Sequence, residues 1–232
     1  MKMAIISDIH SDYEALHNAL DKIKKFKCEM ILCSGDLVGY GIYPEETVNL
    51  IKEYNILSIM GNHDRCALND GKVLGKDRET ILLSERTTEF LKNLPESLFL
   101  TFKGVKIAVY HGSPESDLEF LSPENMNANK LIGWFKKINA DVIIVGHTHK
   151  SFSISFKKTP QRLLKLLNSG SILMNSSKKF NFSWVYDKRK NLFIPESTSH
   201  YGTFGILELP SKSFNVYRIR DARKIKITKL LD

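Results

Sequence analysis

Five apolar, strand-like segments of this chain each end in a short polar cluster, and this arrangement limits the folds that the chain can adopt. The first three segments alternate with helix-like segments, an order typical of parallel strands joined by right-handed crossovers in a layered α/β domain. In such a domain the carboxyl ends of the strands share one edge, where ligands bind. We therefore expect the clusters to meet. They supply Asp8 and His10, Asp36, Asn62 and His63, His111, and His147 and His149.

Hydrophobic periodicity predicts the individual elements. Strands are expected at 2–7, 30–33, 56–60, 98–102, 105–110 and 142–145, and helices at 13–27, 44–54, 78–94 and 127–137. After Lys150 the pattern changes to alternating apolar and polar residues. This alternation predicts antiparallel strands of a second sheet, at 152–156, 163–167, 206–209, 214–219 and 225–230. No linker divides the chain, so we expect one domain over residues 1–232.

Residues 175–200 form a polar excursion in which lysines and arginines are interleaved with aromatic residues. Aromatic faces beside cations suit base stacking and phosphate attraction, which predicts a role at the substrate entrance. The alternative is a small hairpin, residues 182–186 with 191–195, that packs its aromatic side chains against the second sheet. Both interpretations stay open at this stage.

Composition indicates a soluble globular protein, with 42 % hydrophobic and 26 % charged residues. No apolar run reaches the roughly 18 residues of a membrane span. The apolar stretch within residues 1–10 is too short for the hydrophobic region of a signal peptide. Three cysteines without C-x-x-C spacing favour a reducing, cytoplasmic setting. Residues 150–232 hold 17 Lys and Arg against 5 Asp and Glu. This excess suits either a polyanionic partner such as nucleic acid or a merely solvated surface.

The segment DVIIVGHTHK, residues 141–150, places two histidines where a strand ends. Residues i and i+2 of an extended segment point the same way, so His147 and His149 can face one point. Either histidine alone could be an ordinary loop residue. With the other clusters, however, the edge offers two carboxylates, four imidazoles and one amide, too many ligands for one cation. Two ions about 3.5–4 Å apart, bridged by a carboxylate and a hydroxide, would use them all. The donors suit Mn²⁺, Fe²⁺, Co²⁺, Ni²⁺ or Zn²⁺.

In these motifs the chain resembles the calcineurin-like metallophosphoesterases. Their pattern D-x-H, G-D, G-N-H-[DE], H and G-H-x-H is matched by D8-I-H10, G35-D36, G61-N62-H63-D64, H111 and G146-H147-T-H149. The resemblance implies a four-layer α-β-β-α sandwich of two mixed sheets flanked by helices. It also implies two divalent cations, with Mn²⁺ as the first expectation, at the carboxyl ends of the strands.

The resemblance assigns one cation to Asp8, His10, Asp36 and His149, and the other to Asp36, Asn62, His111 and His147, with Asp36 bridging. His63 would face the substrate phosphate and its leaving group as the catalytic side chain. Protein Ser/Thr phosphatases continue G-D-x-V-D-R-G, whereas this chain reads G35-D-L-V-G39-Y-G41. The stretch G35-D-L-V-G-Y-G-I-Y-P-E-E46 resembles instead the small prokaryotic phosphodiesterase-like branch. The branch has a turn N-P-G-S, which is N168-S-G-S171 here.

The resulting expectation is a phosphodiesterase in which a hydroxide between two metals attacks a small phosphodiester or nucleotide. A nuclease or RNA-processing phosphoesterase is an alternative, because the last third of the chain is basic. A non-catalytic scaffold with the same fold is a second alternative, although every ligand position of the pattern is filled.

Overall fold

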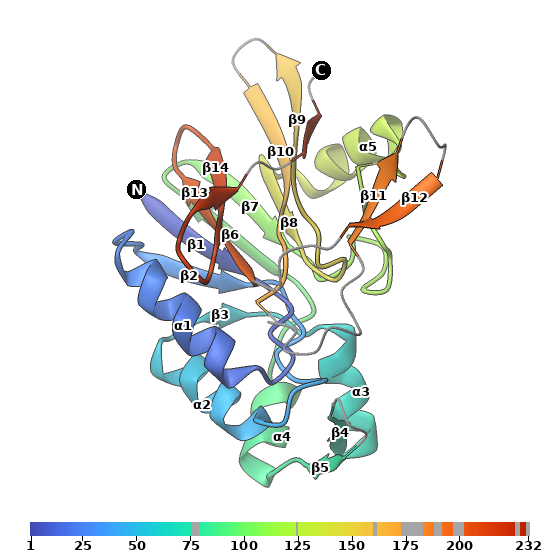
Figure 1. Ribbon diagram of the computed structural model, residues 1–232. Helices are drawn as coiled ribbons and strands as arrows, with labels where there is room; N and C mark the ends of the chain where they lie inside the picture. Colours follow the sequence, from blue (N-terminus) through green and yellow to red (C-terminus); the bar gives the residue numbers. More distant parts are fainter. Residues whose placement is uncertain are drawn as a thin grey trace.

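The computed structural model describes residues 1–75, 79–123, 125–159, 162–172, 183–187, 192–196, 202–225 and 228–230. Two six-stranded mixed sheets lie face to face, and helices cover their outer faces (Figure 1). The α-β-β-α architecture expected from the resemblance is therefore confirmed. A further region of short helices and a small hairpin lies below the sheets in Figure 1.

The first sheet contains the three parallel strands that were predicted near the amino terminus, extended by three strands from the end of the chain. Strand β1 pairs in parallel with β2 and antiparallel with β13. Across the sheet the order is β15 (Lys224–Ile225), β14 (Ser213–Arg218), β13 (Thr203–Glu208), β1 (Lys2–Ile6), β2 (Met30–Cys33) and β3 (Leu57–Ser58).

The second sheet is built around β8, which pairs in parallel with both β7 and β10. Its order is β16 (Thr228–Leu230), β9 (Ser151–Thr159), β10 (Arg162–Ser169), β8 (Val142–Val145), β7 (Val105–Val109) and β6 (Leu98–Phe102). The expectation that all strands after Lys150 form one antiparallel sheet is wrong. They are divided between the two sheets, and β16 pairs in parallel with β9. The alternation of apolar and polar residues indicates which face of a strand is buried, but it does not indicate which neighbouring strand it pairs with.

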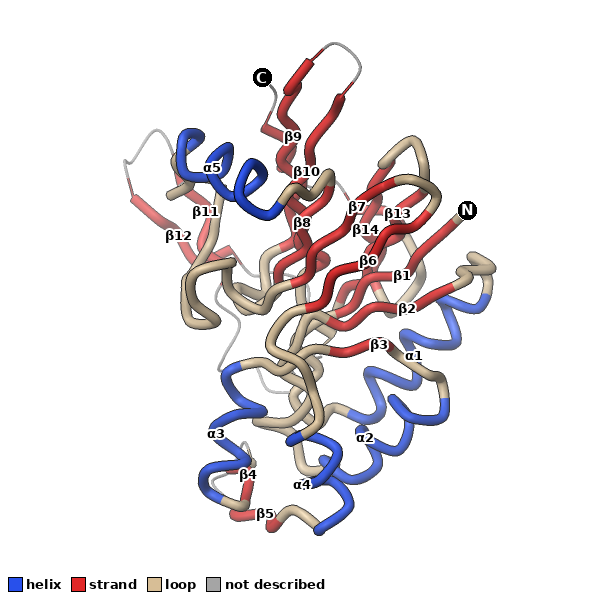
Figure 2. Tube along the Cα trace, turned by 180° about the vertical axis from the view of Figure 1, so that it is seen from behind, coloured by secondary structure: helices blue, strands red, loops and turns tan. Residues whose placement is uncertain are grey.

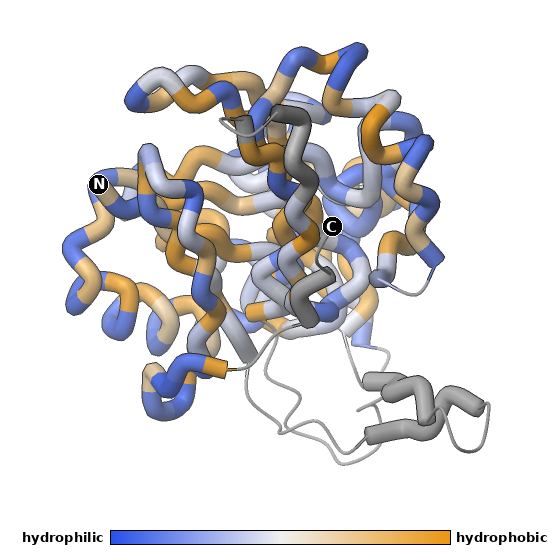
Figure 3. Tube along the Cα trace, turned by 90° about the horizontal axis from the view of Figure 1, so that it is seen from above, coloured by the Kyte–Doolittle hydropathy of each residue, from blue (hydrophilic) through white to orange (hydrophobic). Residues whose placement is uncertain are grey.

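Helices α1 (Tyr13–Lys24) and α2 (Pro44–Glu53) cover the first sheet, and α5 (Ala128–Ile138) covers the second (Figure 2). Strand residues alternate between the layers. Ala4 and Ile6 face the α1 side, whereas Met3 and Ile5 face the other sheet. Both faces of these central strands are buried, which explains their unbroken apolar runs. In Figure 3 the hydrophobic colour accordingly follows the strands in the middle of the molecule.

The region below the sheets contains α3 (Asn62–Asp70), β4 (Lys72–Leu74), β5 (Thr80–Leu82) and α4 (Glu85–Lys92). The predicted helix at 78–94 is wrong in its first part, since β5 pairs with β4 there. The helix begins only at Glu85, because the Ser84 side chain caps it by accepting a hydrogen bond from Thr87 N. Neither α3 nor the β4–β5 hairpin was predicted, because α3 is short and polar and each strand of the hairpin has only three residues.

Within the predicted excursion, β11 (Ser183–Asp187) and β12 (Leu192–Glu196) pair as an antiparallel hairpin. This agrees with the hairpin alternative. The predicted packing of its aromatic side chains, and the role of its lysines and arginines, lie outside the described residues. No helix in the described ranges combines the length and apolarity that a membrane crossing requires.

Candidate metal centre

The loops that follow β1, β2, β3, β7 and β8 converge between the ends of the two sheets and α3 (Figure 1). The β1 and β2 loops are joined directly, because Asp8 N donates to Gly35 O and His10 N donates to Asp36 O, each over 3.0 Å. Several residues in these loops have left-handed backbone angles that are uncommon for residues other than glycine. They are Asp8, His10, Ser11, Asp36, His147 and His149, with φ between 52° and 65°. Strain of this kind clusters at functional sites.

Asp8, His10 and His149 form the first group of donors. The Nε2 atoms of His10 and His149 are 3.1 Å apart, and His149 Nε2 is 3.5 Å from Asp8 Oδ1. The second group contains Asp36 and His111, whose Oδ2 and Nε2 atoms are 3.2 Å apart. Its remaining members are His147 and Asn62, the latter with its Oδ1 2.9 Å from His111 Nε2.

Asp36 lies between the two groups. Its Oδ2 is 3.7 Å from His10 Nε2 of the first group and 3.2 Å from His111 Nε2 of the second. The other oxygen, Oδ1, accepts a hydrogen bond from His63 N over 2.8 Å. All seven predicted ligands and His63 are thus brought to one place. His147 and His149 fall in different groups.

Asp36 and His10 have the protonation states of metal ligands, whereas His111 must release a proton before it can bind a metal ion. Burial raises the pKa of Asp36, but the hydrogen bond and charge of His111 lower it by more, so the carboxylate stays ionised. Burial lowers the pKa of His10 to about 3, which leaves its imidazole neutral. For His111 burial lowers the pKa, but Asp36 raises it to about 9. A proton and a metal ion therefore compete for the same position beside Asp36.

The buried atoms also test whether a cation fits. Asp8 is fully buried, and its Oδ2 has no hydrogen-bond partner among the described residues. A buried carboxylate oxygen without a partner is costly unless it binds a metal ion or another group. Neutral imidazoles and ionised carboxylates without cysteine sulfur are the donor set of divalent transition metals. The residues present fit such ions.

His63 stands at the open side of the centre. Its Nε2 is 3.1 Å from the hydroxyl oxygen of Tyr40, and its ring meets that of His10 edge-on at 4.8 Å between centroids. Tyr40 is 46 % exposed and also packs against the His10 ring. His63 additionally lies close enough to His10 and Asp36 to form a third possible donor group. Metal content of a His63→Ala variant would distinguish a ligand role of this side chain from a role toward the substrate.

Asp64 is a structural residue of the centre that the sequence analysis did not single out. Its Oδ1 accepts hydrogen bonds from Leu37 N and Val38 N, and its Oδ2 from Gly61 N, each over 2.9 Å. It therefore ties the β2 loop to the start of α3. Burial and the nearby Asp36 charge raise its pKa to about 7. The available signal was its position in the motif G61-N62-H63-D64.

Replacing Asp64 with alanine is expected to lower the free energy of unfolding by about 2–4 kcal/mol, because buried N–H groups lose their acceptors. Urea unfolding of the metal-free protein measures this. Asp64→Asn should cost less, since one acceptor oxygen remains. Asp70→Asn, at the exposed far end of the same helix, is the matched control. A loss in Asp64→Ala no larger than in the control would contradict the bracing role.

The turn at residues 168–171 closes the centre from the β10 side. Asn168 Nδ2 donates to Gly146 O and Thr148 Oγ1, and Asn168 Oδ1 accepts from Gly170 N. Gly170 has φ +81°, which explains why glycine is needed there. Ser171 Oγ donates to Asp8 O. The tight turn expected from N168-S-G-S171 is therefore formed, although serine replaces proline.

Comparison with known proteins agrees with this geometry. The model of the calcineurin-like phosphoesterase superfamily domain matches residues 1–187. The chain belongs to this family. Its members are phosphoesterases that depend on divalent metal ions, so the chain is identified as a metal-dependent phosphoesterase hydrolase.

Three known proteins are similar to this chain. An uncharacterized protein of Methanocaldococcus jannaschii is 34 % identical over 194 residues, which are 77 % of this chain and 72 % of that protein. Serine/threonine-protein phosphatase 2 of Escherichia coli is 25 % identical over 169 residues, 62 % of this chain and 78 % of that protein. A metallophosphoesterase from Sphaerobacter thermophilus has a TM-score of 0.66 at 21 % identity, over 94 % of this chain and 88 % of that one.

Proposed function

We propose that this metallophosphoesterase is a phosphodiesterase whose centre holds two divalent cations, with Mn²⁺ the first expectation. One cation would be held by Asp8, His10, Asp36 and His149, and the other by Asp36, Asn62, His111 and His147. When bound, the cations would neutralise charge on the phosphate and lower the pKa of a coordinated water. The shared position of Asp36 between the two donor groups supports this assignment.

His63 is the side chain proposed to act on the substrate. It stands beside the ligand Asn62, and its backbone N–H is held by Asp36. Tyr40 lies at hydrogen-bonding distance from His63 Nε2 and so restrains the ring. From this position the imidazole can donate a proton to the leaving oxygen or stabilise its charge.

The loop after Asp36 is the observation that favours a diester. Protein phosphatases carry an acid and an arginine where this chain has Gly39 and Tyr40. A Cβ at position 39 would lie 2.6 Å from His10 Nδ1, so an acidic side chain does not fit this loop conformation. At position 40 the aromatic ring of Tyr40 packs against His10 and His63, where a protein phosphatase has the guanidinium group of arginine. A phosphomonoester carries up to two negative charges near neutral pH and a diester one, so the diester needs fewer fixed cations.

An activity panel on the Mn²⁺-reconstituted protein tests this proposal. Bis(4-nitrophenyl) phosphate should be hydrolysed with a kcat/KM at least roughly tenfold above that of 4-nitrophenyl phosphate, a difference of about 1.4 kcal/mol. A phosphoserine peptide, the substrate class suggested by the Escherichia coli relative, should be poorer still. Faster hydrolysis of the peptide or the monoester would contradict the diesterase assignment. Short RNA should be included in the same panel. An affinity for RNA that falls steeply with salt concentration would favour the nuclease alternative.

A further inference from the structure

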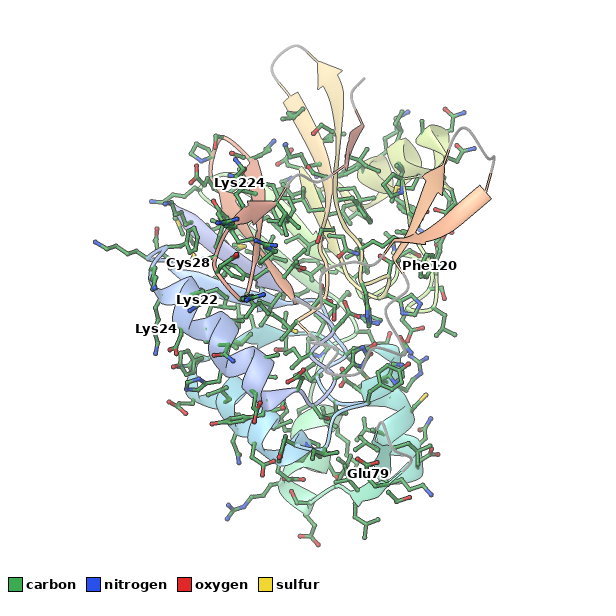
Figure 4. The ribbon with its side chains drawn as sticks, viewed as in Figure 1. Lys22, Lys24, Cys28, Glu79, Phe120 and Lys224 are labelled. Atoms are coloured by element: carbon green, nitrogen blue, oxygen red, sulfur yellow. The ribbon has the colours of Figure 1, made fainter. Side chains whose placement is uncertain are left out.

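Phe120 is an exposed aromatic residue beside the second donor group. The residue is 49 % exposed, and the centroid of its ring lies 6.3 Å from that of His147 at an interplanar angle of 73°. In Figure 4 it lies between α5 and α3, on the loop that connects β7 to α5. Scattered exposed apolar residues are common on protein surfaces, so exposure by itself decides nothing. The distinguishing features are the neighbouring cation and the way the loop is held.

A cation stands over the Phe120 ring. Lys150 Nζ lies 5.7 Å from the ring centroid, within the range of a cation–π contact. Lys150 directly follows His149, so its backbone is part of the strand end that carries two proposed ligands. The pair therefore combines a planar apolar face with a positive charge at the edge of the metal centre.

The loop that carries Phe120 is ordered by its own hydrogen bonds. Gly112 allows the chain to fold back, since a Cβ there would lie 2.6 Å from Ser116 O. Ser113 Oγ accepts from the backbone N–H groups of residues 115 and 116. Asn125 Nδ2 donates to Phe120 O over 2.6 Å, and Leu121 is buried in the core under α5. The exposed position of Phe120 is thus imposed by a braced backbone.

Ion pairs fasten the same loop to helices on both sides. Lys130 of α5 pairs with Glu115 and Glu119, at 3.0 and 2.6 Å. Arg65 of α3 pairs with Asp117. A surface that is fixed before the ligand arrives binds a planar group at a lower cost in conformational entropy.

We propose that Phe120 and Lys150 form a stacking subsite for a planar aromatic group of the substrate, such as a nucleobase or a phenyl ring. The inference rests on the phosphodiesterase function proposed above. His63 and Tyr40 adjoin His10 of the first donor group, whereas Phe120 adjoins His147 of the second. If His63 faces the leaving oxygen, the subsite receives the other ester group, which remains on the phosphate after hydrolysis. The substrate class is therefore a diester whose retained group is aromatic.

Two substrates with the same leaving group test this. Phenyl 4-nitrophenyl phosphate and methyl 4-nitrophenyl phosphate both release 4-nitrophenolate, but only the first retains an aromatic ring. Phe120→Ala should lower kcat/KM for the phenyl ester by roughly tenfold, in the range of base–aromatic stacking. It should leave the methyl ester nearly unchanged. Lys150→Met should have a smaller effect in the same direction, roughly two- to fivefold.

Controls separate stacking from structure. Leu118→Ala changes another exposed apolar residue of the same loop and should affect neither substrate. Phe120→Trp should preserve the preference for the phenyl ester. Thermal unfolding and metal content should match those of the unaltered protein. Equal losses for both substrates, or no loss for either, would overturn the subsite.

Binding of products gives a readout independent of turnover. Phenyl phosphate should bind more tightly than methyl phosphate in calorimetric titration, and Phe120→Ala should remove the difference. If diesters are hydrolysed but Phe120→Ala changes neither hydrolysis nor product binding, the subsite is refuted and the phosphodiesterase function stands. Binding of phenyl phosphate that depends on Phe120, with no diester hydrolysis, would refute the function instead.

Discussion

Asp36→Asn is expected to weaken metal binding in both donor groups and to lower turnover by roughly 10³-fold, because several kcal/mol of charge stabilisation are lost. The substitution is conservative in shape. The amide oxygen can still accept the hydrogen bond from His63 N. What changes is the charge of the oxygen that lies near both His10 and His111. Elemental analysis should find close to two metal ions per chain before the substitution and markedly fewer after it.

The matched control is Asp21→Asn, which removes one carboxylate from the exposed surface of α1. It should leave metal content and turnover unchanged. If Asp36→Asn keeps both ions and full activity, Asp36 does not bridge the two groups. Loss of a single ion would instead assign Asp36 to one group alone.

His63→Ala is expected to leave the metal content nearly intact while turnover falls roughly 10²–10⁴-fold, the range for loss of a general acid. The loss should be smaller for a diester with a very acidic leaving group, which needs little protonation. Tyr40→Phe should reduce turnover less, because it removes only the hydroxyl that restrains the imidazole. Parallel assays with 4-nitrophenyl and unsubstituted phenyl leaving groups measure this difference.

Three outcomes of the His63 experiment carry different meanings. Loss of a metal ion would make His63 a ligand, as its nearness to His10 and Asp36 allows. An equal loss of turnover for good and poor leaving groups would assign it to electrostatic positioning. Unchanged turnover would remove it from the reaction altogether.

The first strands, and the polar clusters that follow each of them in the chain, could be predicted from the sequence, because both faces of these strands are buried. An unbroken apolar run that ends in a polar residue indicates a buried strand whose carboxyl end lies at the edge of the sheet where ligands bind. The pattern identified all seven candidate ligands and His63, which the fold brings together. Helices α1, α2 and α5 were also predicted, since each has one apolar face against a sheet.

Pairing between distant segments could not be predicted in the same way. Strands β13–β15 join the first sheet, and β9, β10 and β16 join the second. Their alternating patterns are alike, and the choice depends on which neighbouring strand offers free N–H and C=O groups. Helix α4 likewise begins where Ser84 caps it, rather than where helix-forming residues begin.

Local burial patterns thus specify which chemical groups reach the edge of the sheets, because the positions of the strand ends follow from them. How those groups are supported, and which residues surround them, depends on tertiary contacts. Asp64 braces two loops through backbone N–H groups that no side-chain pattern reveals. Phe120 reaches His147 because a loop of mixed composition is pinned to α3 and α5. Such contacts join residues far apart in the chain, so their energies depend on the folded arrangement rather than on local sequence.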